Sequence, residues 1–235
     1  MNTVFKFYLQ AWVLFALSSG AALGWTLNEM RKWTTGWQSL WRVGIILLVM
    51  GALLYPMTAT SAKMRDRMST EAPHTLDGMD YMLTSTYPDE GGVVDLAEEY
   101  RAIRWMQENV SGTPVTVEAN TPLYRWGSRF SIYTGLPTVL GWDWHQTQQR
   151  GFSQSSQINE RRQDIMLFYT LEDTDYAQDF IQRYNVEYII VGQLERNYYP
   201  GAGLFKFEQM EGTLWHEVYR DGQTIIYQVN PGNEE

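Results

Sequence analysis

The chain has 235 residues, a formal net charge of −9 at pH 7 and no cysteine, which excludes disulfides, thiolate catalysis and cysteine-based metal sites. Residues 1–60 hold four basic side chains and one acidic side chain, whereas residues 61–235 hold fourteen basic and twenty-six acidic side chains. Because binding to nucleic acid needs clustered Lys and Arg, the acidic second part argues against a nucleic-acid partner.

Two apolar runs open the chain. The first extends from about Val4 to Trp25 and the second from Val43 to about Ala59. Each approaches the ~20 residues that a helix needs to cross a bilayer. Pro56 lies in the last turn of the second run, where a kink near the interface is tolerated. We therefore predict that residues 1–60 form a transmembrane helical hairpin with a short connecting loop, and that the lipid bilayer is a partner.

The first run has an alternative interpretation as a cleaved signal peptide. Its basic start is weak, with Lys6 alone, and the small residues around Ser18–Ala22 do not end in a clean cleavage pattern. The orientation of the hairpin is not fixed by charge. Three basic residues in the loop oppose four on the other side, so the positive-inside rule favours neither direction.

Residues 61–94 are polar, weakly periodic and punctuated by Pro and Gly, which predicts a linker. The pattern sharpens at Asp95, where DLAEEYRAIRWMQENV is typical of an amphipathic helix of about four turns. Asp95 is the expected N-cap, and Glu98 occupies the capping-box position. We interpret the Glu98-Glu99 pair as the solvated face of this helix.

The rest of the body, residues 95–235, alternates short β-rich runs with helical ones. Strands are predicted at Pro114–Ala119, Thr138–Trp142 and Val186–Gly192, helices at Asn159–Tyr169, Asp175–Tyr184 and Leu204–Met210, and a helix or irregular turn at Tyr124–Thr134. Leu214–Arg220 and Thr224–Val229 form a hairpin around Asp221-Gly222, the strongest short turn signal in the chain. This alternation predicts a Rossmann-like α/β domain with a mainly parallel sheet and a C-terminal antiparallel hairpin.

In such a sheet, ligands bind beyond the carboxyl ends of the strands. Polar side chains follow all three predicted strands, and we expect a ligand-binding edge formed by Glu118, Arg129, Trp142, Asp143, Trp144, His145, Arg150, Glu195 and Arg196. Carboxylates, Arg and Trp together suit a sugar or a phosphate-bearing lipid head group. Arg129 and Arg150 would hold phosphate or a carboxylate, and Trp142 and Trp144 would stack on a sugar ring. The alternative is that strand ends are polar simply because they reach water.

His145 is open to two interpretations. With Asp143 two residues away, it could form an acid/base pair or half of a metal site. A hydrogen-bonded structural histidine beside Trp is the other. Because no two histidines share a helix-type ligand spacing, we predict no metal site. No phosphate-cradling glycine loop or dinucleotide fingerprint occurs, so we also predict no cofactor.

Four blocks of the chain resemble, in this order, the C-terminal part of the YYY-type multi-pass membrane proteins, a family without a settled function. The blocks are MNTVFKFYLQAW, EYRAIRWMQENVSGTPVTVEA, RFSIYTGLPTVLGWDWHQTQQRG and YNVEYIIVGQLER. That family is distantly similar to the GT-C glycosyltransferases, which carry many membrane helices before an extracytoplasmic domain and use polyprenyl-phosphate sugars. The namesake tyrosine run is absent here, where Tyr198-Tyr199 is only a pair.

The resemblance implies that the body lies outside the cytoplasm, with the loop inside. It further implies a C-terminal fragment of a longer GT-C-like protein, without the loop in which such enzymes keep their catalytic acid. The upstream helices, on the same protein or a partner chain, would be partners. We therefore predict an integral membrane protein whose body recognises a polyprenyl-phosphate sugar or its acceptor, and whose catalytic residues are unknown. We expect the chain alone to lack transferase activity. The alternative is a non-catalytic assembly domain.

Overall fold

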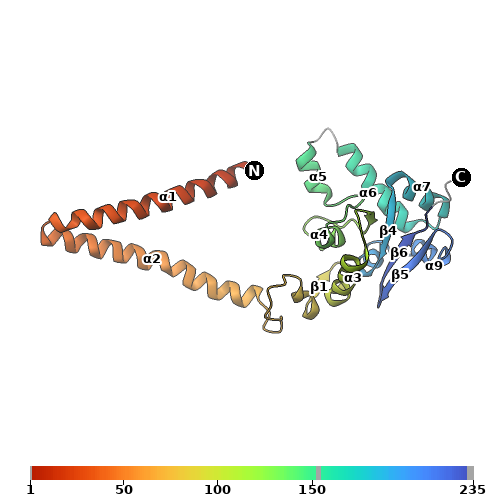
Figure 1. Ribbon diagram of the computed structural model, residues 1–235, viewed down its shortest axis with the longest axis horizontal. Helices are drawn as coiled ribbons and strands as arrows, with labels where there is room; N and C mark the ends of the chain where they lie inside the picture. The colour runs from red at the N-terminus through yellow and green to blue at the C-terminus, as the bar shows by residue number, and fades with distance from the viewer. Residues whose placement is uncertain (1, 152–154, 232–235) are drawn as a thin grey trace. The chain divides into compact units, whose positions relative to one another are not determined.

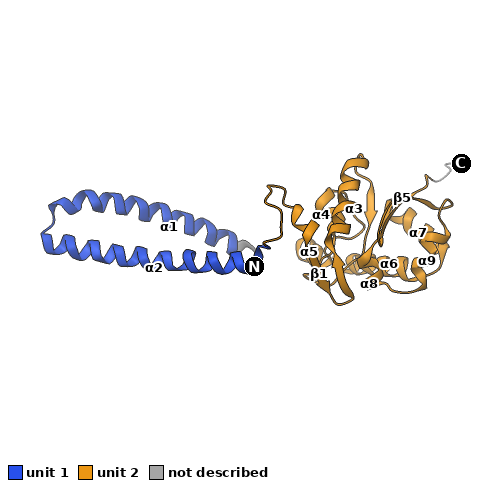
Figure 2. Ribbon diagram, turned by 90° about the horizontal axis from the view of Figure 1, so that it is seen from below, with its two compact units in different colours: residues 1–69 blue, residues 70–235 orange. Residues whose placement is uncertain are grey.

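The computed structural model describes residues 2–151 and 155–231, with side chains from residue 4 onward. The chain divides into two compact units, residues 1–69 and residues 70–235, which Figure 2 shows in different colours. Each unit has its own internal contacts, so each is described by itself below.

The first unit consists of two long helices joined by a short turn. These are α1 (Asn2–Glu29), η1 (Met30–Lys32) and α2 (Thr35–Arg67). At 1.5 Å per residue, helices of 28 and 33 residues are about 42 and 50 Å long, more than the ~30 Å hydrocarbon core of a bilayer. No residue in their apolar windows is buried. Both helices are therefore long and apolar enough to cross a membrane, and they suggest membrane association.

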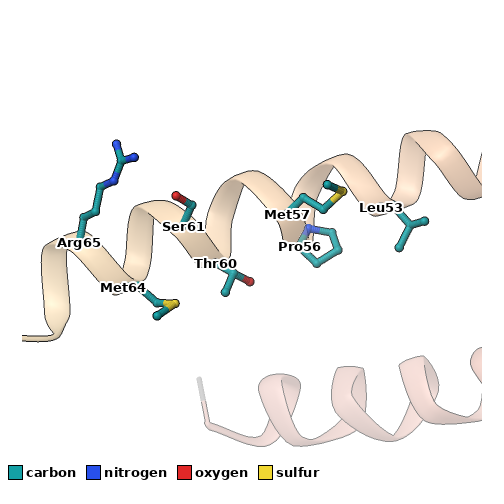
Figure 3. Close-up of a pocket in the computed structure, with 7 residues that line it drawn as sticks. All are labelled: Leu53, Pro56, Met57, Thr60, Ser61, Met64 and Arg65. Carbon is teal, nitrogen blue, oxygen red and sulfur yellow. The ribbon is translucent and has the colours of Figure 1, made fainter.

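An apolar groove of about 670 Å³ runs along α2 around Pro56. All the residues that line it come from this one helix, as Figure 3 shows, and they extend from Leu53 to Arg65. A groove with a single helical wall is an open surface, not an enclosed site. The candidate site is therefore sought in the second unit.

The second unit begins with a short helix and a hairpin: η2 (Asp80–Thr84), β1 (Thr86–Asp89) and β2 (Gly92–Asp95). The segment 61–94, expected as a linker, thus contains the end of α2 and these elements. Met82 and Val94 from it are fully buried in the core of the body.

Helix α3 (Leu96–Asn109) forms as the sequence predicts. The Asp95 side chain caps it by accepting a hydrogen bond from the Ala97 amide at 2.9 Å. The capping-box expectation for Glu98 is wrong, because its carboxylate accepts instead from the Gln223 amide and the Thr224 hydroxyl, at 2.9 and 2.7 Å. Glu98 thereby ties the start of α3 to the hairpin turn.

The sheet has the order β3-β4-β6-β5, with β3 (Val115–Val117), β4 (Val186–Val191), β5 (Trp215–Asp221) and β6 (Thr224–Val229) (Figure 1). Only β3 and β4 are parallel, while β4–β6 and β6–β5 are antiparallel. The C-terminal hairpin is confirmed, but the expectation of a mainly parallel sheet is wrong. The short turn at Gly222 accounts for the β5–β6 pair, because strands joined by two residues must be antiparallel. The prediction failed at the next pair, because β6 of that hairpin also pairs antiparallel with β4.

A second correction concerns Thr138–Trp142, predicted as a buried strand. It forms a single parallel bridge, between Thr116 and Thr138, in which the Val139 amide donates to the Thr116 carbonyl at 3.1 Å. The segment cannot extend this pairing because Pro137 has no amide proton and the chain enters a helix at Asp143.

Helices cover both faces of the sheet. On one face Trp105 of α3 packs on Tyr219 of β5, with ring centroids 5.5 Å apart. Tyr219 pairs with Ile226, so Tyr227, the next residue of β6, points to the opposite face and contacts Phe207. The remaining helices are α4 (Arg129–Thr134), α5 (Asp143–Arg150), α6 (Ser155–Thr170), α7 (Thr174–Tyr184), α8 (Gln193–Tyr198), η4 (Ala202–Leu204) and α9 (Phe205–Gln209).

Candidate functional site

The parallel pair β3–β4 brings three of the predicted site residues together. Glu118 follows β3, Glu195 lies in the first turn of α8 after β4, and Arg129 begins α4 between them. Arg129 Nη2 donates to Glu195 Oε2 at 2.8 Å, and Nη1 lies 3.5 Å from Glu118 Oε2. The sequence thus predicted correctly that these strand ends converge.

A fourth member, Glu99 of α3, accepts a hydrogen bond from Arg129 Nε. The four side chains, here called the Arg129 cluster, are each 0–1% exposed. The interpretation of Glu99 as a solvated helix face is therefore wrong. Its spacing from Ile103 and Met106, four and seven residues on, places it on the apolar stripe of α3, which is the sequence signal that could have identified it.

Backbone amides satisfy most of the remaining carboxylate oxygens. Glu118 accepts from the amides of Phe130 and Ser131, both at 3.1 Å, at the start of α4. Glu195 accepts from the amides of Ala119 and Gly192 at 2.7 and 2.8 Å. The Arg129 cluster therefore fixes the chain where it leaves β3, where it leaves β4, and where α4 begins.

The Arg129 cluster holds three carboxyl groups around one guanidinium. Burial raises the pKa of Glu99 to about 7, although the Arg129 charge opposes this shift. Burial likewise raises the pKa of Glu118. Burial acts in the same direction on Glu195, but the Arg129 charge and the hydrogen bonds to this carboxylate outweigh it and lower its pKa. Within the described chain, Glu99 Oε1 has no hydrogen-bond partner, as expected of the carboxyl that most readily holds a proton.

The predicted role of Arg129 in holding phosphate meets a physical obstacle. Its guanidinium is 1% exposed and all its nitrogens face carboxylates, so no donor is available to an external anion. Burying a charge is tolerated only where it is paired and hydrogen-bonded, and that is the environment of Arg129.

Apart from Arg196, the other predicted residues lie on and next to α5. Trp142 is 46% exposed, its indole Nε1 donates to the Gly127 carbonyl at 3.2 Å, and its ring centroid lies 5.3 Å from that of His145. The two rings border a depression of about 300 Å³. The depression is lined by Ser128, Ser131, Ile132, Gly141, Trp142, His145, Gln146 and Gln149.

Asp143 does not orient His145. Its carboxylate accepts from the Trp144 amide at 2.6 Å in the first turn of α5, and pairs with Arg162 at 3.6 Å. The His145 ring instead packs on Trp142. In residues 2–151 and 155–231, no group of three or more His, Asp and Glu side chains is arranged to hold a metal ion.

The last three predicted residues, Trp144, Arg150 and Arg196, do not line that depression. Arg196 Nε donates to the Gln223 carbonyl at 3.2 Å, at the hairpin turn. Arg150, at the end of α5, lines a separate cavity of about 110 Å³ between α5 and α6. Trp144 is 41% exposed and is not among the residues that line the depression.

No protein-family model matches the chain, and no curated protein matches it, so membership of the YYY-type family is not shown. The chain is similar to two crystal structures of the C-terminal globular domain of oligosaccharyltransferase from Archaeoglobus fulgidus. The first is 13% identical, with a TM-score of 0.38, over 57% of this chain and 97% of that chain. The second is 14% identical, with a TM-score of 0.32, over 56% and 94%. Similarity at these TM-scores does not assign a function.

Proposed function

We propose that this protein is a membrane-anchored, extracytoplasmic carbohydrate-recognition domain, and that the depression beside Trp142 binds a sugar. One observation carries the proposal. Trp142 is half exposed, its indole N–H is already bonded to the Gly127 carbonyl, and its ring borders a depression of ligand size. Such a ring is held in place and offers its apolar face to a ligand.

The lining of the depression favours a neutral, hydroxyl-rich ligand. Apart from Ile132 and Gly141, the side chains beside Trp142 and His145 are Ser and Gln, and no Lys, Arg, Asp or Glu is among them. Hydroxyl and amide groups both donate and accept hydrogen bonds, which matches the hydroxyl groups of a sugar. The volume of about 300 Å³ lies at the lower end of small-molecule sites.

The Arg129 cluster would hold in position two residues that line the depression. Ser128 and Ser131 line the depression, and Arg129 lies between them. Glu118 holds the Ser131 amide, and Ser128 adopts a left-handed backbone conformation with φ of 56° just before α4. Loss of the cluster would therefore move the serines that face the ligand.

Three finer elements of the proposal rest on the sequence resemblance. We propose that the body belongs to a longer GT-C-like protein, that it faces the outside of the cell, and that the sugar is carried by polyprenyl phosphate. The same proposal includes the predicted division of the chain into a membrane hairpin (residues 1–60), a linker (residues 61–94) and a body (residues 95–235). The isolated chain should then lack transferase activity, and turnover of a polyprenyl-phosphate sugar by it would overturn this part.

Binding of the full chain, purified in detergent micelles, to immobilised neutral oligosaccharides tests the proposal. Trp142→Ala should weaken binding about tenfold, because one aromatic contact contributes about 1.5 kcal/mol. Trp144→Ala is the matched control, since Trp144 is similarly exposed but does not line the depression. Absence of binding to any oligosaccharide, or equal losses in the two variants, would contradict the proposal.

The second candidate is a non-catalytic assembly domain, and the sealed Arg129 cluster favours it. Alanine at Asp143 and at Arg150 separates the two candidates. A lowered thermal midpoint without weaker ligand binding by the protein that remains folded would favour assembly, because Asp143 lies at the start of α5 and pairs with Arg162. An intact fold with weaker oligosaccharide binding in Asp143→Ala, or with weaker binding of a phosphate-bearing ligand in Arg150→Ala, would favour recognition.

A further inference from the structure

The cavity between α5 and α6 differs in charge from the rest of the body. Arg150 from the end of α5 and Arg161 from α6 both line it, with the amide side chains of Gln146 and Gln157. No carboxylate is among its lining residues, although residues 61–235 carry twelve more acidic than basic side chains. A pair of arginines without a counter-charge is therefore concentrated at one small cavity of an acidic body.

Neither arginine is neutralised within the described residues. Arg161 Nη1 donates to the Val139 carbonyl at 2.8 Å, and its guanidinium lies 5.2 Å from the Tyr184 ring centroid. These contacts hold Arg161 in place but leave its other N–H groups without an ion-pair partner in the described chain. Arg150 has no ion pair among those residues either. Arg161 thus supplies oriented donors, and both arginines supply positive charge without an ion-pair partner among the described residues.

A buried hydroxyl gives an independent indication of a ligand. Thr138 lines the same cavity, and its Oγ1 is buried without a hydrogen-bond partner in the part of the chain that the structure describes. Leaving such a group unsatisfied costs about 1–3 kcal/mol, so native proteins usually provide it with a partner. A ligand oxygen within reach of Oγ1 would satisfy it.

We propose that this cavity is a binding site for a phosphate-sized oxyanion. Guanidinium groups bind phosphate oxygens in pairs, and a hydroxyl and two amides add donors for the others. The cavity volume of about 110 Å³ leaves room for one tetrahedral group.

The cavity also adjoins the depression beside Trp142, because Gln146 lines both. One ligand could therefore place a neutral ring against Trp142 and an anionic group between the arginines. This joint occupation rests on the proposed function, whereas binding of the anion does not. The ligand class is then a phosphorylated sugar, with the phosphate either free at its far end or esterified to a lipid.

Titration calorimetry of the full chain in detergent micelles with inorganic phosphate tests the site. We expect Arg150→Gln to weaken binding at least tenfold and Thr138→Val to weaken it about threefold, since charged hydrogen bonds are the stronger ones. Arg104→Gln is the control, because Arg104 lies on α3 and pairs with Glu108. If the wild-type chain binds no phosphate, or if Arg150→Gln binds like Arg104→Gln, the site does not exist.

Arg161→Lys keeps the charge but loses the paired donors, so weakened phosphate binding in this variant supports the proposal even if a neutral substitution fails to fold. The thermal unfolding midpoint of each variant is measured alongside. Trp142→Ala should keep phosphate binding while losing oligosaccharide binding, and Arg150→Gln should do the reverse. Failure of one site is thereby distinguished from failure of the other.

Two further arms identify the source of the phosphate. Tighter binding of glucose 1-phosphate than of inorganic phosphate, lost in Trp142→Ala, supports a soluble sugar phosphate. Arg150-dependent binding of the micellar protein to phosphatidic acid vesicles, but not to phosphatidylcholine vesicles, supports a lipid-borne phosphate. Vesicle binding that Arg150→Gln leaves unchanged would count against the lipid source.

Discussion

Two arginine sites in the same body show opposite arrangements of charge. In the Arg129 cluster one guanidinium lies among three carboxyl groups at 0–1% exposure. In the α5–α6 cavity two guanidinium groups meet no carboxylate among the lining residues. In the first arrangement each guanidinium nitrogen pairs with a carboxylate inside the protein and is closed off from solvent, so it holds the fold together. The second leaves donors for something outside it. Burial and counter-charge, not residue type, separate a structural arginine from a binding one.

The largest effect should come from removing the charge at the centre of the Arg129 cluster. Arg129→Met should lower the free energy of unfolding by about 3–5 kcal/mol, because breaking a buried ion pair leaves uncompensated carboxylates. In a body of this size, that lowers the thermal midpoint by about 10 °C, measurable by tryptophan fluorescence in detergent micelles. A midpoint within 2 °C of wild type, by roughly the same scale, would show that the cluster is not structural.

The stability of the protein should depend on pH because Glu99 titrates at different pH values in the folded and unfolded states. Its pKa is raised to about 7 in the folded protein from the ordinary value of 4.5, so the folded state holds a proton that the unfolded state releases. The stability that protonated Glu99 provides is therefore fully present below pH 4.5. As the pH rises toward 7, the free energy of unfolding falls by on the order of 3 kcal/mol.

Glu99→Gln should remove this dependence while keeping an oxygen that can accept from Arg129. We expect its thermal midpoint to exceed that of wild type at pH 8 and to approach it at pH 5. The partly exposed Glu217, which pairs with Arg220 on β5, supplies the control as Glu217→Gln. Parallel pH profiles for wild type and Glu99→Gln would assign the titration to another group.

At the cavity, stability and binding should move in opposite directions. Thr138→Val replaces the unpartnered hydroxyl with a methyl of similar size. Without phosphate, we expect the free energy of unfolding to rise by up to about 1 kcal/mol, because a buried unsatisfied group is removed. The midpoint would rise by about 2–4 °C. A lower midpoint would indicate that the hydroxyl has a partner such as an ordered water.

The smallest effect sharpens the contrast between the two arginines. Arg150→Met should change the free energy of unfolding by no more than about 0.5 kcal/mol, as is usual for surface substitutions without a partner. The same assay used for Arg129→Met measures it. A loss comparable to that of Arg129→Met would make both arginines structural and would remove the distinction drawn here.

Much of the local structure follows from sequence patterns. The amphipathic period of residues 95–110, the N-cap at Asp95, the apolar run at Val186 and the turn at Asp221-Gly222 each correspond to an observed element. The failures are informative. Thr138–Trp142 has the composition of a strand but makes one bridge, since pairing beyond it depends on a neighbour and not on composition.

For the candidate site, the sequence identified residue types and left their environments open. Glu118, Arg129 and Glu195 do meet, as the strand ends predict, but inside the body. Glu99 joins them from 30 residues before Arg129, and Glu195 from 66 residues after it. A pattern among neighbouring residues cannot predict that side chains so far apart in the sequence are buried together. Trp142 and His145 could be predicted to lie together, because they are only three residues apart along the chain, and their rings are in contact.

By itself, then, the sequence determined the two long apolar helices, the main helices and strands of the body, and the gathering of acidic and basic side chains after β3 and β4. These depend on periodicity, capping and turn chemistry within a few residues. Only the tertiary structure decided the mixed strand order, the sealing of Arg129 and the exposure of Trp142 and Arg150. Those outcomes depend on which distant segments exclude water from a side chain, a property of packing in three dimensions and not of neighbours along the chain.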